Sequence, residues 1–386
     1  MRLKLSVPAA VIPIYGTTLA DMLGYTLMIP LLPALAERYH ASYFIAGTLI
    51  SVPAVCSMFS APIWGRVSDR VGRKTIILIS QGVTLVGYVM LALAHSLAWI
   101  FIARIVSGLG AGNLSAAQSF VADVTKKSQR DQAFALYGVV FGAAFVVGPV
   151  ASSFLMRRDI QFPFYAAAAL EAANIIFTFA LLPWKVGRHE QEVEIEEIAR
   201  AAIERPLRSL LLRQFLFIFG VVYFLSGFAL YLHAALHVAG TQVGWILAGA
   251  GILGGIVEGV IVAPLSARLG ERLVAQCGFA GLFIGYLLLL ATHGIVLFII
   301  AVGVWAAGAA MVEPSIMAAL SLRIPKRERG ALMGVSDSVN SVALVIAPAA
   351  SGAIIGANAQ LIGILPAAAT AVALWIGYRA RKFIRR

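Results

Sequence analysis

Residues 65–74 read GRVSDRVGRK, and they separate two stretches, 42–64 and 75–94, that contain no charged residue. Each stretch is about as long as the 20 or so apolar residues that an α-helix needs to cross a bilayer. The segment between them holds two glycines, so we expect it to form a short, tight loop between two membrane-spanning helices. The Asp69–Arg70 pair can tie the neighbouring helix ends together at this loop.

The same alternation of long apolar stretches and short polar breaks continues along the rest of the chain. The only polar segment of any length, 184–212, lies between the sixth and seventh predicted helices. We therefore predict an N-terminal six-helix half at 1–183, a cytoplasmic linker at 184–212 and a C-terminal six-helix half at 213–386. The predicted helices lie near 10–34, 42–64, 75–94, 98–122, 133–156, 162–183, 213–236, 243–266, 273–292, 295–321, 330–355 and 359–379.

Composition agrees with an all-α membrane protein and excludes other classes. The chain has 386 residues, of which 60% are hydrophobic and only 12% are charged, and its mean hydropathy is +0.90. Soluble globular domains are typically about 25% charged and 45–50% apolar, and disordered chains are poorer still in apolar residues. A water-soluble fold of this length could not bury so much apolar surface.

The net charge of +12 reflects membrane topology rather than nucleic-acid binding. When the loops are assigned alternately to the two sides, 26 of the 30 Lys and Arg residues fall on one side. The other side holds Arg38, Arg157 and Arg158, and Arg104 lies within a span. Basic loops stay in the cytoplasm, so this distribution predicts an even number of spans with both termini in the cytoplasm.

The loop sequence resembles the signature G-x-L-x-D-R-x-G-R-K of the major facilitator superfamily. Gly65, Asp69, Arg70, Gly72, Arg73 and Lys74 match it, and Val67 replaces the usual leucine. Other patches are similar to the drug:proton antiporter branch of that superfamily. These are Asp21–Gly24 with Pro30–Pro33, Arg104–Gly112 with Ser107 in place of glutamine, and Gly148–Pro149 followed by Ser152–Ser153 where the branch has two glycines.

This resemblance implies two related six-helix halves with a substrate cavity between them, working by alternating access. It implies that spans 1, 4, 7 and 10 line the cavity and that Gly148 and Pro149 pack helices closely. The second half repeats the motifs only weakly. Ala267 stands where a repeated loop aspartate would fall, and Ala347–Pro348 in span eleven matches Gly148–Pro149.

Ionisable residues within spans are costly and usually functional. Asp21 lies about twelve residues into span one, roughly 18 Å along the helix at about 1.5 Å per residue, and therefore near mid-depth. We expect it to load and release a proton as its surroundings change, with Glu313 in span ten and Glu258 in span eight as further proton-coupling candidates. The alternative for Asp21 is a fixed ion pair with Arg104 that only holds spans one and four together.

The remaining candidates divide into counter-ion, gating and structural residues. Arg104 stays charged at any relevant pH, so it would tune Asp21 or hold an anionic group, unless it only packs helices. Glu171 lies on span six, an outer helix in the family, and is predicted to be structural. Residues expected to form gate contacts at the cytoplasmic face are Gly65, Asp69, Arg70, Gly72, Arg73, Asp123, Arg130 and Asp337.

Aromatic residues could build an apolar cavity wall that tolerates cationic substrates, although most membrane aromatics only pack or lie at the interface. The candidates for substrate contact are Tyr25, Tyr137, Phe141, Tyr223 and Trp305. No set of residues with metal-ligand spacing is visible, so no metal and no cofactor are expected. The driving force would be the proton gradient.

The function predicted from these features is proton-coupled antiport that exports small amphipathic or cationic compounds, as in multidrug efflux. The alternative is the same fold exporting or facilitating a specific metabolite such as a sugar, siderophore, amino acid or lysolipid. An enzyme is not expected, since no nucleophile elbow, metal set or phosphate-binding loop is present. We expect a monomer in the cytoplasmic (inner) membrane whose partners are substrate, protons and lipid, without nucleic acid.

Overall fold

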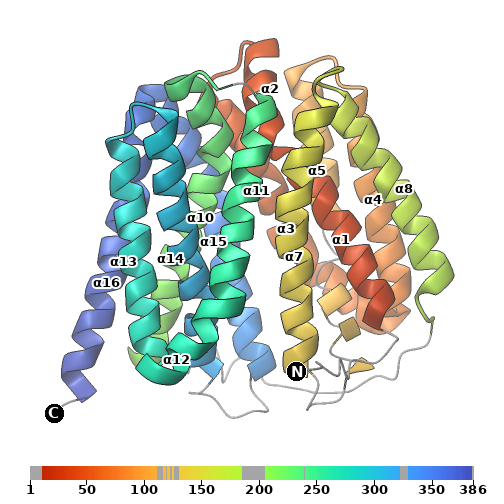
Figure 1. The fold of residues 1–386 in the computed structure, drawn as a ribbon. Helices are drawn as coiled ribbons and strands as arrows, with labels where there is room; N and C mark the ends of the chain where they lie inside the picture. The colour runs from red at the N-terminus through yellow and green to blue at the C-terminus, as the bar shows by residue number, and fades with distance from the viewer. Residues whose placement is uncertain are drawn as a thin grey trace. The chain divides into compact units, whose positions relative to one another are not determined.

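The computed structural model describes residues 11–110, 116–118, 120–121, 124–125, 130–184, 205–238, 240–321 and 329–384. Every regular element among them is helical (Figure 1). The elements in the first part of the chain are α1 (Ile12–Thr26), η2 (Ile29–Leu31), α2 (Leu32–Arg38), α3 (Tyr43–Val71), α4 (Arg73–Ala92), α5 (Leu97–Leu109), α7 (Arg130–Leu155) and α8 (Phe162–Leu181). The later elements are α10 (Arg205–Leu236), α11 (Gly240–Ile256), η3 (Val257–Val262), α12 (Ala263–Leu269), α13 (Glu271–Leu290), α14 (Ile295–Ser321), α15 (Arg329–Asn358), η4 (Ala359–Gly363) and α16 (Ile364–Ile384).

Helix occurs in each of the twelve predicted ranges. By length and apolar composition, nine stretches of the described residues could each cross a membrane, and 97–109 and 142–155 form shorter apolar helices. One of the nine, Ser338–Arg379, is 42 residues long, about twice the length that a single crossing needs. The number twelve therefore stays a prediction, while the all-helical class is confirmed.

Two predicted helices are interrupted, the first by a turn that contains proline and the second by a π-helical segment. The first ends at Thr26, and the chain continues through the 3₁₀ turn η2 into α2, where Pro30 and Pro33 lack the N–H that a continuous α-helix requires. The helix predicted at 243–266 passes through a π-helical segment, η3, between α11 and α12. A π segment inserts one extra residue into a helix and often lies at functional positions.

The chain forms two compact units. Unit 1 comprises residues 1–40, 52–190 and 240–248, and unit 2 comprises 41–51, 191–239 and 249–386. The first turns of α3 thus pack with unit 2, where an added Cβ on Gly47 would meet the carbonyl of Pro348. The start of α11 packs with unit 1, where the N–H of Gly244 donates to Ser153 Oγ at 3.2 Å.

The two units repeat one packing plan. In unit 1, α1 packs against α7 and α8, and α4 packs against α5 and α8. In unit 2, α10 packs against α15 and α16, and α13 packs against α14 and α16. The helices α1, α4, α5, α7 and α8 therefore correspond, in that order, to α10, α13, α14, α15 and α16, as an internal repeat predicts.

The predicted loop at 65–74 is almost entirely helical. Helix α3 runs to Val71 and α4 begins at Arg73, so Gly72 alone makes the turn, with φ 105°. Gly270 makes the same turn between α12 and α13, with φ 79°. Glycine adopts positive φ without steric cost, which explains why both units have glycine at this position.

Candidate functional site

Asp21 lies in a buried polar cluster of unit 1, which we call the acid cluster: Asp21 of α1 with Glu171 and Asn174 of α8. The amide of Asn174 donates to Asp21 Oδ1 at 2.9 Å and to the carbonyl of Thr17 at 3.2 Å. Only 8% of Asp21 is exposed. Helix α8 thus holds the aspartate in place through the side-chain amide of Asn174.

Glu171, predicted to be structural, belongs to this cluster. It is 1% exposed, and its carboxyl group lies near Asp21 and Asn174. Two neighbouring carboxyl groups in a buried site cannot both be ionised without strong repulsion, so the cluster is suited to hold a proton.

A hydrogen-bonded chain extends the acid cluster along α8 to α4. Thr17 Oγ1 and Thr178 Oγ1 lie 3.0 Å apart, and Gln81 Nε2 donates to Thr178 Oγ1 at 3.1 Å. Glu171, Asn174 and Thr178 have the spacing i, i+3, i+7, which places them on one face of a helix. This polar face on an apolar helix is the sequence signal that could have identified Glu171 and Asn174.

Arg104 of α5 and two tyrosines form the other side of this polar region. Arg104 is 2% exposed and interacts electrostatically with Tyr25 and Tyr88. Tyr88 is also near enough to Asp21 and Glu171 to interact with both. The structure therefore brings the predicted residues Asp21, Tyr25 and Arg104 together, with Tyr88 as an additional member that sequence reasoning missed.

Gly24 explains how Tyr88 reaches this position. A Cβ added to Gly24 would lie 2.8 Å from the Tyr88 hydroxyl oxygen and 3.0 Å from its ring. The glycine three residues after Asp21 thus leaves room for the tyrosine beside the aspartate. This contact accounts physically for the Asp21–Gly24 motif in α1.

The loop signature stabilises the same unit at one end. Arg73 Nη1 donates to Ser68 Oγ at 2.9 Å across the Gly72 turn. Lys74 is 3% exposed, and its Nζ donates to the carbonyls of Phe179 at 2.7 Å and Leu182 at 2.6 Å. Because the last carbonyls of a helix have no partners within it, Lys74 caps the C-terminal end of α8.

Gly148 and Pro149 make close contacts within unit 1. A Cβ on Gly148 would collide with Thr26 Oγ1 of α1, and one on Gly244 would collide with the Pro149 carbonyl and lie 2.5 Å from Ser153 Oγ. Ser153, which departs from the glycine of the family motif, accepts the hydrogen bond from Gly244. The serine therefore adds a polar contact to the close packing.

Glu258 and Glu313 form a second acid pair, in unit 2. Glu258 lies in η3 and Glu313 in α14, just before Pro314. Both side chains are exposed, and they are near enough to interact electrostatically. An exposed carboxyl group in an apolar helix requires water or a polar partner within the membrane.

Tyr223 and Trp305 lie in the interior of unit 2. Tyr223 is fully buried and Trp305 is 6% exposed. Trp305 Nε1 donates to the hydroxyl of Tyr286 at 3.0 Å, and its ring lies 4.9 Å from that of Phe224. Their contact with substrate stays a prediction, since in this structure both side chains pack against other residues of unit 2.

The structure describes the side chains of only some of the predicted gate residues. Gly65 lies in α3 with no atom within 4 Å of an added Cβ, and Arg70 is exposed. Asp123 lies outside the described residues, and so do the side chains of Asp69, Arg130, Tyr137, Phe141 and Asp337. Beside Asp337, Gln214 of α10 accepts from Ser336 Oγ and donates to Asn340 Oδ1, each at 3.1 Å.

Known proteins resemble this chain along most of its length. It is 29% identical to tetracycline resistance protein, class C, of Escherichia coli over 364 residues, which cover 91% of each chain. It is 25% identical to multidrug resistance protein 1 of Bacillus subtilis (strain 168), over 86% of this chain and 85% of that protein. The crystal structure of the nucleoside transporter NupG has the same fold, with a TM-score of 0.75 and 13% identity over 96% of this chain and 99% of that chain.

Residues 14–233 and 210–383 match the sequence profile of the Major Facilitator Superfamily. The two matched segments cover both units. Together with the relatives, they make the protein a multi-pass membrane transporter rather than an enzyme. The chain therefore belongs to the Major Facilitator Superfamily and is a relative of its drug-resistance members.

Proposed function

We propose that the protein is a proton-coupled antiporter that exports small amphipathic or cationic compounds by alternating access. The observation that carries this proposal is the acid cluster, in which Asp21 and Glu171 lie side by side and buried. Such a pair retains one proton for as long as it stays dry, and releases it when water or a cationic group reaches it. A transporter that alternates its access would create these two environments in turn.

Arg104 and the tyrosines suit the same task. A fixed positive charge near the cluster favours its ionised form, so movement of Arg104 relative to Asp21 would change how tightly the proton is held. The amide of Asn174 orients Asp21 in this conformation. We infer that Asp21 is the principal coupling residue and that Glu171 shares its proton.

The exposed acid pair in unit 2, Glu258 and Glu313, is proposed to act on the substrate. Glu258 and Glu313 are negatively charged when ionised and have exposed side chains, so they could attract a cationic substrate. The drug-resistance relatives support export of an amphipathic compound, and tetracycline is the first substrate to test. Its identity as the substrate is part of the proposal.

The test is transport by the purified protein in sealed proteoliposomes with an imposed pH difference. We expect uptake of tetracycline, or of a cationic dye, against its concentration gradient when the vesicle interior is acidic. Asp21→Asn should abolish this accumulation, while Asp159→Asn is the matched control, because Asp159 is an exposed aspartate just before α8.

Three results would contradict the proposal. Accumulation that does not respond to the pH difference would exclude proton coupling, and full activity of Asp21→Asn would exclude the assigned residue. Gradient-independent transport of one sugar, amino acid, siderophore or lysolipid would favour the alternative function, a facilitator or exporter of a specific metabolite.

The orientation also forms part of the proposal. We propose twelve membrane helices, both termini in the cytoplasm, a monomer in the cytoplasmic membrane, and no cofactor besides the proton gradient. The distribution of Lys and Arg over the loops supports this orientation. Labelling of single cysteines introduced into the 184–204 segment, from either side of sealed vesicles, would test it.

A further inference from the structure

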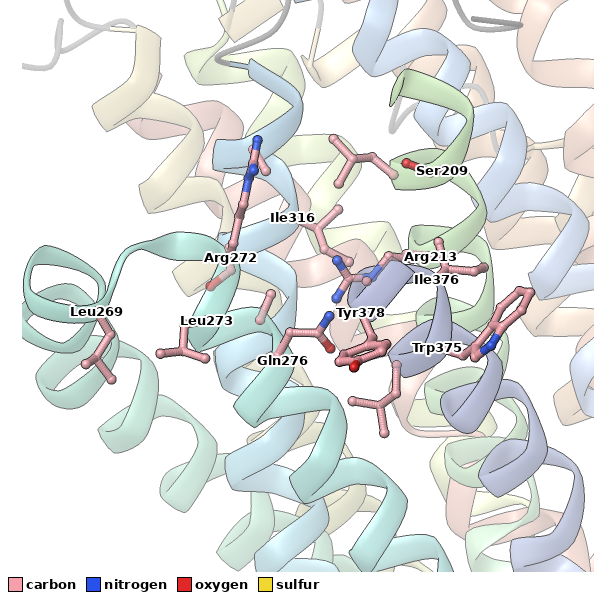
Figure 2. A pocket seen from close by; sticks show the side chains of 16 residues that line it. Ser209, Arg213, Leu269, Arg272, Leu273, Gln276, Ile316, Trp375, Ile376 and Tyr378 are labelled. Carbon is pink, nitrogen blue, oxygen red and sulfur yellow. The ribbon is translucent and has the colours of Figure 1, made fainter. Parts of the chain in front are cut away.

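Unit 2 contains a cavity of about 790 Å³ between α10, α13, α14 and α16 (Figure 2). Its lining is mostly apolar, and it includes two arginines, Arg213 and Arg272, together with Gln276. Among the described residues that line it there is no carboxylate. A cavity of this composition is suited to a molecule with an apolar part and a negatively charged group.

Arg213 is the feature that points to a ligand. It is only 7% exposed, and its Nε and Nη2 atoms have no hydrogen-bond partner among the described residues. Its guanidinium carbon lies 4.7 Å from the centre of the Phe279 ring. A buried charged group with two donor atoms left unpaired is unfavourable unless an anion pairs with it.

Gly377 leaves the space in which Arg213 and Gln276 meet. A Cβ at Gly377 would collide with the Gln276 amide nitrogen and lie 3.0 Å from the guanidinium carbon of Arg213. Figure 2 shows the side chains of Arg213, Gln276 and Tyr378 pointing toward one another. Donors from α10 and α13 therefore converge at one place beside α16.

The corresponding place in unit 1 is filled by protein. Lys74 and Arg272 each follow their turn glycine by two residues, but Lys74 caps α8, whereas Arg272 lines the cavity. Thr17 and Arg213 also occupy matching positions, each seven residues before the glycine that faces the tyrosine of its unit, Gly24 or Gly220. Thr17 forms hydrogen bonds to α8, whereas Arg213 lines the cavity. Unit 2 thus has a charged cavity where, in unit 1, Thr17 and Lys74 form hydrogen bonds to α8.

Two exposed aromatic residues of the cavity lining are of the kind that favours the level of lipid headgroups. Trp375 and Tyr378, which line it, are 52% and 59% exposed, and tryptophan and tyrosine favour the membrane–water interface. Arg379 stacks on Trp375 at 3.9 Å from the ring centre. Basic pockets between membrane helices near the interface bind the headgroups of anionic lipids.

We propose that this cavity binds the phosphate headgroup of an anionic phospholipid, with Arg213 and Gln276 donating to its oxygens. The acyl chains lie along the exposed apolar side chains at the cavity edge, Leu269, Leu273 and Trp375. A free phosphate ion shares the headgroup chemistry, but it would leave this apolar lining unused.

The experiment measures binding to the purified full-length protein in an uncharged detergent by isothermal titration. The probes are short-chain phosphatidylglycerol, short-chain phosphatidylcholine and inorganic phosphate. We expect phosphatidylglycerol to bind at least about tenfold more tightly than either other probe. The choline cation of phosphatidylcholine would lie near two arginines with no lining carboxylate to pair with it, and inorganic phosphate has no acyl chains for the apolar lining. Equal binding of phosphatidylcholine, or of inorganic phosphate, would overturn the proposal.

Arg213→Met retains most of the length of the side chain and removes its charge, and we expect it to weaken phosphatidylglycerol binding by about tenfold or more. The matched control is Arg157→Met, because Arg157 also stacks on a phenylalanine, at 4.9 Å, but is exposed. If Arg213→Met does not fold, Gln276→Leu tests the second donor and should weaken binding about threefold. Wild-type affinity in a folded variant at either position would overturn the assignment.

Discussion

In unit 1 the tyrosine sixteen residues after the turn glycine, Tyr88, lies among Asp21, Glu171 and Arg104. In unit 2 the tyrosine at the same count, Tyr286, packs against Phe224 and accepts a hydrogen bond from Trp305. Both hydroxyl groups face a glycine of the first helix of their unit, Gly24 or Gly220. The backbone plan is repeated, but charged groups surround the first tyrosine and aromatic rings surround the second.

This difference shows how a repeated fold divides its tasks. An aromatic interior stabilises helix packing without burying a charged group. A buried charged interior lowers the stability of a fold, because each ionisable group within a membrane costs at least a few kcal/mol, so such groups are usually retained for a function. We infer that unit 1 retains its polar interior for proton coupling and that the aromatic cluster around Tyr286 in unit 2 is a scaffold.

The largest effect is expected for the acids themselves. Asp21→Asn should lower gradient-driven efflux by about 100-fold, the scale of losing a positioned acid–base group. Glu313→Gln should lower it by less than about tenfold, since Glu313 is exposed and is proposed to attract substrate rather than to carry the proton. Initial rates in proteoliposomes measure both, and an equal loss in the two variants would remove the distinction between the units.

The next prediction concerns helix packing at the matched motifs of α7 and α15. Gly148→Ala should destabilise the protein by about 1–3 kcal/mol, because the new Cβ would collide with Thr26. At the corresponding position Ala347 already has a Cβ and is fully buried, so Ala347→Gly should cost only about 1 kcal/mol. Unfolding in mixed micelles measures both values, and the reverse order would show that the contact at Gly148 relaxes freely.

The third prediction compares Lys74 and Arg272, which occupy matching positions after the turn glycines, for their effect on the free energy of unfolding. Lys74→Met should destabilise the protein by about 2 kcal/mol, since two carbonyls at the end of α8 lose a charged donor. Arg272→Met should change stability by less than about 0.5 kcal/mol, as expected of a residue at the edge of a cavity. The same unfolding measurement applies, and equal losses would argue against a lysine cap particular to unit 1.

The smallest effect is expected for the paired tyrosines. Tyr286→Phe should destabilise the protein by about 1 kcal/mol, because Trp305 Nε1 would lose its acceptor, and it should leave transport unchanged. Tyr88→Phe should instead alter the pH dependence of transport, since its hydroxyl lies among the ionisable groups of unit 1. A shifted pH profile for Tyr286→Phe would contradict the division of tasks.

Sequence patterns identified the helices well because each one must present about 20 apolar residues to lipid. They also identified Gly72, since charged residues and two glycines between apolar stretches indicate a turn. They did not predict that α3 would extend to Val71, because an apolar stretch indicates only the part of a helix that lies in lipid and not where the helix ends. The break after Thr26, inside the helix predicted at 10–34, was not predicted although Pro30 and Pro33 follow it, and the π segment at Glu258 has no comparable signal in the sequence.

The candidate site was predicted in part. Asp21 and Arg104 could be chosen because isolated charges in apolar helices are rare and usually functional. Glu171 was assigned to the outer helices, and Asn174 was not considered, because which face of α8 meets α1 depends on how the helices pack. The asparagine that orients Asp21 is 153 residues away in sequence.

Length, apolar composition and the distribution of basic residues were sufficient to establish a multi-pass helical membrane protein, because the bilayer imposes the same requirement on every span. These properties are local, so they can be read along the chain. Which carboxyl groups meet, which lysine caps a helix and which arginine has donors left unsatisfied depend on contacts between distant segments. Those contacts arise only when the helices pack, and they distinguish the two units that the sequence motifs suggest are alike.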